Sequence, residues 1–122
     1  MSQLILIVDD NEKNRKLARD VLEFAGFETL EATGGLESVA LAQEHLPALV
    51  LMDIRMPDIS GTEALKLLRQ DSRTAEIPVV ALTSSTMRGD EERFLKEGFD
   101  GYLAKPISVR EFPDQVRGFL RE

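Results

Sequence analysis

Polar and charged residues stand directly after four short, mostly apolar runs of this sequence. They are three carboxylates, one hydroxyl and one ammonium: Asp9, Asp10, Asp53, Thr83 and Lys105. Each of these residue types alone is common in turns and helix caps. Turn chemistry alone would rarely place acid, hydroxyl and base after every inner run, so we interpret the set as one functional site.

The chemistry that suits these side chains is cation binding. Carboxylates within a few ångströms repel one another by about 1–4 kcal/mol per pair at a surface-like dielectric, so a multivalent cation is needed among them. Carboxylate, carbonyl and water ligands favour a hard ion such as Mg²⁺. The sequence has no cysteine and a single histidine, His45, which excludes disulfides, thiolate sites and multi-histidine metal sites.

A nucleophile at this site would be a carboxylate or a hydroxyl, because the sequence has no thiol. A carboxylate that attacks phosphorus forms an acyl phosphate, which is a known covalent role of aspartate. The metal and Lys105 would then neutralise charge on the phosphoryl oxygens, and the hydroxyl of Thr83 would bond one of them.

Two kinds of segment alternate along the chain and have to position these residues. Short apolar runs favour strands buried on both faces, and a polar alternation favours an edge strand. The buried candidates are Leu4–Val8, Leu49–Met52 and Val79–Leu82, the edge candidate is Phe27–Ala32, and Gly101–Ala104 is a fifth candidate strand. Helical spacing of apolar residues favours helices at Asn11–Ala25, Leu36–Leu46, Gly61–Arg69, Asp90–Glu97 and in a last segment capped by Ser108.

Strands that alternate with helices predict an α/β fold with a parallel sheet covered on both faces. Such sheets bind ligands beyond the carboxyl ends of their strands, which is where the polar residues stand. Pro113 fits poorly, because a proline inside the last helix removes a hydrogen bond. That helix therefore either begins later than Ser108 or has a distorted first turn.

The composition favours a single globular domain, residues 1–122, without a linker or repeat. Apolar residues make up 43% of the chain and charged residues 30%. No apolar run approaches the ~18 residues that span a bilayer, so we expect a cytoplasmic protein without membrane insertion. The formal net charge of −7 disfavours direct nucleic-acid binding.

Four motifs in register along nearly the whole chain carry a family resemblance: Ile7–Asn11, Met52–Gly61, Leu82–Ser84 and Tyr102–Pro106. Together they resemble the receiver domain of two-component response regulators. The resemblance implies a (βα)5 three-layer sandwich of the flavodoxin and CheY-like class, with a parallel sheet in the order 2-1-3-4-5. It also implies a phospho-accepting switch with only self-phosphorylation and slow self-dephosphorylation, and not an enzyme.

The resemblance implies a role for each acidic residue. Asp53 is the expected phosphoryl acceptor, supplied by the phosphohistidine of a sensor histidine kinase or a histidine phosphotransfer protein. Asp10 and Asp53 would ligate Mg²⁺ directly, together with the backbone carbonyl of Arg55. Asp9 would act largely through water.

The resemblance also implies a switch. Thr83 and Lys105 would grip the phosphoryl group, and the bond from Lys105 to Pro106 would be cis. We expect phosphorylation to shift the loop 84–89 and to let Tyr102 fill the vacated space. The face formed by the fourth helix, the fifth strand and the fifth helix would then change its affinity for a downstream protein partner. An ordinary half-buried strand position is the alternative for Tyr102. A monomer or weak homodimer is expected.

A narrower resemblance is to the stand-alone receivers of the DivK type, carried by Met87–Glu92 and Lys105–Val109. Pro113 departs from the unbroken final helix of those receivers. In this family, the positions two residues beyond the acceptor aspartate and beyond the switch threonine tune phosphoryl lifetime. Here they are Arg55 and Ser85.

Three alternatives stay open on the residues alone. A magnesium-dependent phosphotransferase would usually have an aspartate two residues after its nucleophile, where this chain has Arg55 or Asn11. A flavodoxin-like electron carrier would need a hydroxyl- and glycine-rich loop in place of Asp9–Glu12. A receiver cut from a longer hybrid kinase is the third, although Met1 and the end soon after the last helix favour a free-standing protein.

Overall fold

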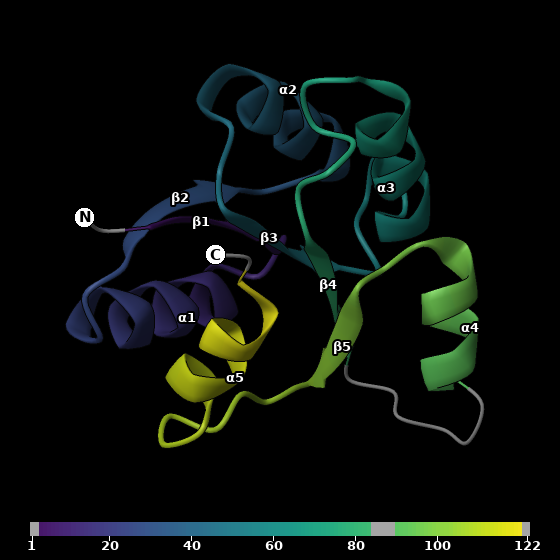
Figure 1. The fold of residues 1–122 in the computed structure, drawn as a ribbon. Helices are drawn as coiled ribbons and strands as arrows, with labels where there is room; N and C mark the ends of the chain where they lie inside the picture. The colour runs from purple at the N-terminus through teal and green to yellow at the C-terminus, as the bar shows by residue number, and fades with distance from the viewer. Residues whose placement is uncertain (1–2, 84–89, 121–122) are drawn as a thin grey trace.

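Parallel strands form one sheet in the computed structural model, which describes residues 3–83 and 90–120. The strands are β1 (Leu4–Val8), β2 (Glu28–Ala32), β3 (Leu49–Asp53), β4 (Val79–Thr83) and β5 (Gly101–Ala104). Their order across the sheet is β2-β1-β3-β4-β5 (Figure 1). The predicted α/β fold and its strand order are therefore confirmed, and β2 lies at an edge as its alternating polarity predicted.

A helix follows each strand: α1 (Glu12–Phe24), α2 (Gly35–His45), α3 (Gly61–Gln70), α4 (Asp90–Glu97) and α5 (Phe112–Phe119). Local signals set several of their ends. The Asn11 side chain accepts from the Asn14 amide and caps α1. Ser60 and Glu63 form a capping box at α3. Within the described part of the chain, no helix combines the length and apolarity needed to cross a membrane.

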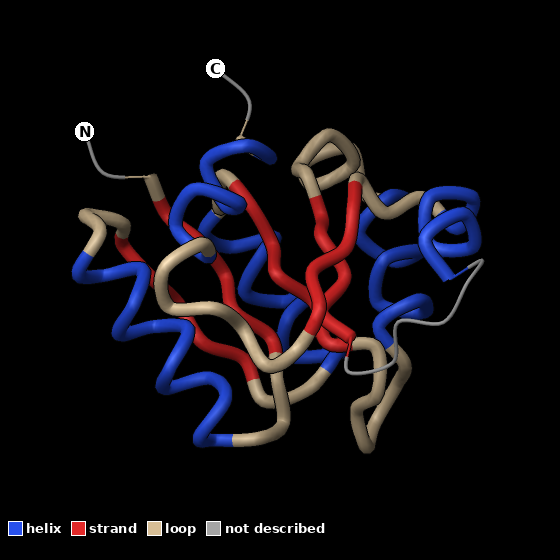
Figure 2. Tube along the Cα trace, turned by 90° about the horizontal axis from the view of Figure 1, so that it is seen from below, coloured by secondary structure: helices blue, strands red, loops and turns tan. Residues whose placement is uncertain are grey.

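The sheet is the middle of three layers (Figures 1 and 2). Helices α1 and α5 cover one face, and α2, α3 and α4 cover the other. Alternate residues of a strand point to opposite faces, so Ile5 and Ile7 pack with α1 and α5, while Leu6 and Val8 pack on the other side. All four are fully buried, which explains why β1 is apolar without alternation.

The last helix begins later than Ser108. α5 begins at Phe112, and Pro113 lies in its first turn, where a missing amide costs no helical hydrogen bond. The residues before it form a turn in which the Phe112 amide donates to the Ser108 carbonyl at 2.8 Å. Of the two possibilities that the sequence left open for Pro113, the late start is correct.

Candidate functional site

The carboxyl ends of β1, β3, β4 and β5 lie at the same end of the sheet. The register of β1 and β3 places Asp9 and Asp53 level with each other at adjacent strand ends. Thr83 ends β4 and Lys105 follows β5, and the Lys105 amide donates to the Thr83 carbonyl at 2.8 Å. The structure thus brings together residues that lie far apart in the sequence.

Three carboxylates form a cluster at this end of the sheet. Asp9, Asp10 and Asp53 each offer one oxygen, and the three oxygens lie within 4.8 Å of one another. Asp9 and Asp53 are buried, whereas Asp10 is exposed. An all-oxygen donor set that is open to water on one side fits a small hard cation such as Mg²⁺, which keeps several of its waters.

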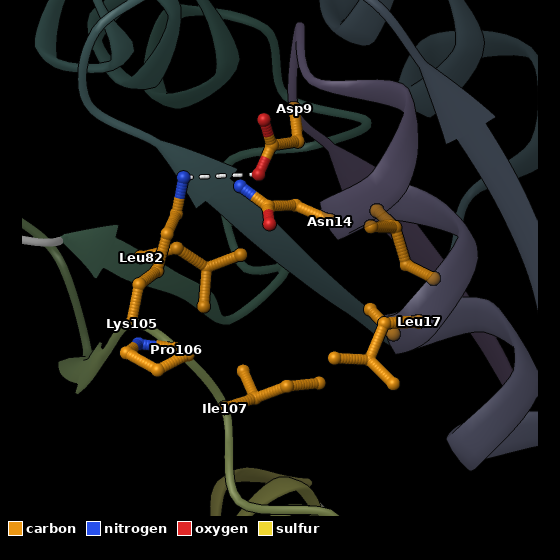
Figure 3. Close-up of a pocket in the computed structure, with 9 residues that line it drawn as sticks. Asp9, Asn14, Leu17, Leu82, Lys105, Pro106 and Ile107 are labelled. Carbon is orange, nitrogen blue, oxygen red and sulfur yellow. Dashed lines mark hydrogen bonds and ion pairs between the residues drawn. The ribbon is translucent and has the colours of Figure 1, made fainter.

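Lys105 bridges the two buried carboxylates. Its Nζ lies 2.9 Å from Oδ2 of Asp9 and 3.2 Å from Oδ2 of Asp53. Figure 3 shows the ammonium turned toward Asp9, beside a small pocket walled by Leu17, Ile107 and other apolar groups.

The ionisation of the site reflects this crowding. Burial raises the pKa of the Asp53 carboxyl, the charge of Lys105 opposes that rise, and the charge of Asp9 adds to it. Burial alone would lower the pKa of Lys105, but its bond to Asp9 and the charge of Asp53 raise it above its ordinary value. The site therefore favours a fixed positive charge beside a carboxylate that is costly to keep ionised.

The loop after β3 is anchored at two points. The Gly61 amide donates to the Ile54 carbonyl at 2.9 Å, which closes the loop at the start of α3. Asp58 accepts from the amides of Leu36 at 2.9 Å and Gly35 at 3.0 Å, so it caps α2 from outside that helix. These amides, that of Leu36 foremost, hold the pKa of Asp58 at about 2.

Gly61 provides a test of how tightly this loop is packed. A Cβ there would press on the Asp53 carbonyl oxygen and lie 3.0 Å from Cα of Ile54, and neither backbone atom can rotate away. We expect Gly61→Ala to lower the free energy of unfolding by about 1–3 kcal/mol, measured by urea denaturation. Gly118→Ala in α5 is the matched control, because its Cβ would meet nothing within 4 Å. Equal stability of the two variants would contradict the close packing at Gly61.

The remaining predicted residues have different positions. Tyr102 is half-buried on β5, with its ring centroid 6.5 Å from that of Phe94. Arg55 is exposed, its amide donates to Oδ1 of Asp53 at 3.4 Å, and the peptide bond before Pro106 is cis. Ser85 lies outside the described residues, so the tuning of phosphoryl lifetime by Arg55 and Ser85 stays a prediction.

Sequence reasoning did not assign three residues that hold the site together. Arg15 bonds the carbonyl of Asp9, Glu31 bonds Arg15, and Asp58 joins the loop after β3 to α2. The sequence could have indicated a role only for Glu31, because a charged residue on a strand usually has a partner. Its partner on α1 is visible only once the helix is packed on the sheet.

Comparison with known proteins shows the family over nearly the whole chain. Residues 5–117 match the family model for the response regulator receiver domain. The chain belongs to the response regulator receiver family. This receiver is 46% identical over 120 residues to the polar-differentiation response regulator DivK of Brucella ovis, and the match covers 98% of each chain. The DivK protein of Brucella anthropi matches with the same identity and coverage, so the predicted resemblance to DivK-type receivers is confirmed.

Solved structures of other receivers have the same fold. The chemotaxis protein CheY4 of Vibrio cholerae matches with a TM-score of 0.92 and 28% identity, over 98% of this chain and 100% of that one. The receiver domain of the sensor histidine kinase PA1611 from Pseudomonas aeruginosa PAO1 has a TM-score of 0.88 at 29% identity, over 98% of both chains. Its active-site cleft holds a coordinated magnesium ion. The present chain is thus a receiver of phosphorelay signalling rather than a flavodoxin-like electron carrier.

Proposed function

We propose that this receiver, a single domain over residues 1–122, accepts a phosphoryl group on Asp53 and changes its affinity for a protein partner as a result. One observation carries the proposal. A buried carboxylate lies beside two further carboxylates and 3.2 Å from the ammonium of Lys105. A nucleophile, the ligands for a cation and a fixed positive charge are thereby gathered at one place.

Mg²⁺ is the proposed cofactor. We assign Asp10, Asp53 and the backbone carbonyl of Arg55 as its direct protein ligands. Both carboxylate oxygens of Asp9 accept short N–H bonds, at 2.8 Å from the Asn11 amide and 2.9 Å from Lys105. The corresponding contacts of Asp53 are longer, at 3.4 Å and 3.2 Å, which supports direct ligation by Asp53 and a role for Asp9 through water. The magnesium ion in the cleft of the PA1611 receiver supports Mg²⁺ as the ion. When bound, the ion would neutralise charge on the transferring phosphoryl oxygens.

The residues of the site suit transfer from a phosphohistidine. A carboxylate oxygen of Asp53 would bond to phosphorus while the phosphorus–nitrogen bond breaks and its electron pair leaves with the imidazole. Lys105 would offset the charge of the added group. Thr83, at the end of the strand next to β3, would place its hydroxyl on one phosphoryl oxygen. We expect slow loss of the phosphoryl group to water and no turnover of an outside substrate.

The proposed partners follow from this chemistry. The donor is a sensor histidine kinase or a histidine phosphotransfer protein, and the receiving partner is a downstream protein that reads the face formed by α4, β5 and α5. The DivK relatives are named for polar differentiation, which supports an output in cell polarity. Because kinases draw on cytoplasmic ATP, we place the protein in the cytoplasm.

Labelling with acetyl phosphate tests the proposal directly. The protein is incubated with acetyl phosphate with and without Mg²⁺, and the modified residue is mapped by mass spectrometry. We expect Mg²⁺-dependent labelling at Asp53. No label, or a label at another residue, would overturn the proposal. A pull-down with Mg²⁺ and beryllofluoride, compared with Asp53→Ala, would then identify the partner.

Thr83→Ala tests the coupling between the site and the output face. Thr83 is buried at the end of β4, and the loop 84–89 that follows it lies outside the described residues. We expect the variant to be labelled at Asp53 to a similar extent, but its partner affinity should change at least about threefold less on phosphorylation, because the hydroxyl that joins the phosphoryl group to β4 is missing. Titration calorimetry with the captured partner measures this. An unchanged response would show that the coupling does not pass through Thr83.

A further inference from the structure

The backbone carbonyl of Asp9 has a side-chain partner other than Lys105. Nη1 of Arg15 donates to the Asp9 carbonyl oxygen at 2.9 Å. The Arg15 side chain belongs to α1 and is only 14% exposed, so the contact is largely shielded from solvent. A charged donor therefore holds the backbone of a residue whose carboxylate belongs to the acidic cluster.

Glu31 orients the same guanidinium from the edge strand. Nε of Arg15 donates to Oε1 of Glu31 at 3.2 Å, and Glu31 lies on β2, next to β1. The second carboxylate oxygen of Glu31 accepts from Nη1 of Arg19 at 3.1 Å. Glu31 thus offers one oxygen to each arginine. Arg15 also donates to the Asp9 carbonyl, whereas Arg19 bonds Glu31 and the neighbouring Asp20.

The contacts of Asp9 fix both its backbone and its side chain. Its amide donates to the Ala32 carbonyl at 3.1 Å, Oδ1 accepts from the Asn11 amide at 2.8 Å, and Oδ2 accepts from Lys105 at 2.9 Å. Asp9 is 2% exposed, so removal of Arg15 would leave its carbonyl without this donor in a site with little access to water. The backbone would then shift toward another partner, and the carboxylate would move with it.

We infer that Arg15, oriented by Glu31, is a positioning residue that holds Asp9 and thereby the geometry of the cation site. This inference rests on the proposed binding of Mg²⁺. A guanidinium suits the role because its planar fork donates in two fixed directions at once, whereas a lysine ammonium is a point charge on a flexible stem. The edge strand β2 thus contributes to the site through Glu31, although neither Glu31 nor Arg15 belongs to the acidic cluster.

Mg²⁺ affinity in four variants tests the inference, measured by titration calorimetry. We expect Arg15→Gln to bind Mg²⁺ about 10-fold more weakly, which is the usual effect of losing a partner that orients a ligand. Loss of a positive charge near a cation site would by itself strengthen binding, so the direction separates positioning from charge. Glu31→Gln and Arg15→Lys should weaken binding by a smaller factor. Arg19→Gln is the matched control, with the same charge change and the same partner Glu31, and should bind as the wild type does.

Amide hydrogen exchange without metal gives a second readout. The amides of Asp9 and Asn11 should exchange faster in Arg15→Gln but not in Arg19→Gln. Mg²⁺ binding by Arg15→Gln that equals or exceeds that of the wild type would overturn the inference, and so would equal effects of Arg15→Gln and Arg19→Gln. If Arg15→Gln does not fold, Arg15→Lys and Glu31→Gln decide the matter by the same comparison. Failure of the wild type to bind Mg²⁺ would overturn the proposed function instead, while the exchange experiment would still decide whether Arg15 holds Asp9.

Discussion

Replacement of Asp53 by asparagine is expected to reduce the rate of labelling by acetyl phosphate by at least about 1000-fold, the scale on which loss of a nucleophile acts in enzymes. The amide has nearly the same shape as the carboxylate but has no anionic oxygen to attack phosphorus. Asp9 and Asp10 keep their carboxylates in the same cluster. The variant therefore tests whether Asp53, and not one of these two, is the nucleophile. Intact-protein mass spectrometry over a time course measures the rate.

Asp114→Asn is the control for this experiment. It makes the same chemical change at an exposed position on α5, outside the acidic cluster. We expect it to be labelled as fast as the wild type. Substantial labelling of Asp53→Asn at Asp9 or Asp10 would show that the acceptor has been misassigned.

Replacement of Lys105 by methionine is expected to destabilise the metal-free protein by about 2 kcal/mol. Removal of one partner from a fully buried ion pair costs about 3–5 kcal/mol, and we lower that figure because Lys105 retains 15% of its exposure and is screened by solvent. The raised pKa of Lys105 means that its contribution is fully present at pH 7 and is lost only as the pH rises past its ordinary value of 10.5. Urea denaturation in the presence of a chelator at pH 7 measures the loss.

Mg²⁺ is expected to change the stability of Lys105→Met more than that of the wild type. In Lys105→Met the buried carboxylates have lost their ammonium, so the ion should restore more stability to the variant than it adds to the wild type. Lys66→Met, at an exposed position on α3, is the matched control and should change stability by less than about 0.5 kcal/mol. If Lys105→Met were as stable as the control without metal, the bridge to Asp9 and Asp53 would contribute nothing to folding.

The arrangement of strands was predictable because burial on two faces leaves a simple mark on a sequence. β1, β3 and β4 are continuous apolar runs since helices cover both of their faces, and β2 alternates since it lies at the edge. Chain direction then required the residues after the strands to share one end of the sheet. Asp9, Asp53, Thr83 and Lys105 were found by that rule.

The extent of α5 was harder to predict from the sequence. The apolar spacing continues back to Val109, but that side chain is 61% exposed and lies in the turn before the helix. Pro113 is compatible with a first turn and costs hydrogen bonds further inside, so the helix begins at Phe112, which is fully buried. Spacing indicates which face of a helix is apolar, whereas a local backbone constraint decides where the helix begins.

The sequence by itself determined the fold class, the edge of the sheet that holds the chemistry and the residue types present there. Only the tertiary structure decided which side chains bond one another, such as Lys105 to both buried aspartates, Arg15 to the Asp9 carbonyl and Asp58 to the start of α2. The physical reason is the separation along the chain over which each signal acts. Periodicity and turn chemistry act over a few neighbouring residues, whereas these contacts join segments that meet only when helices pack on the sheet.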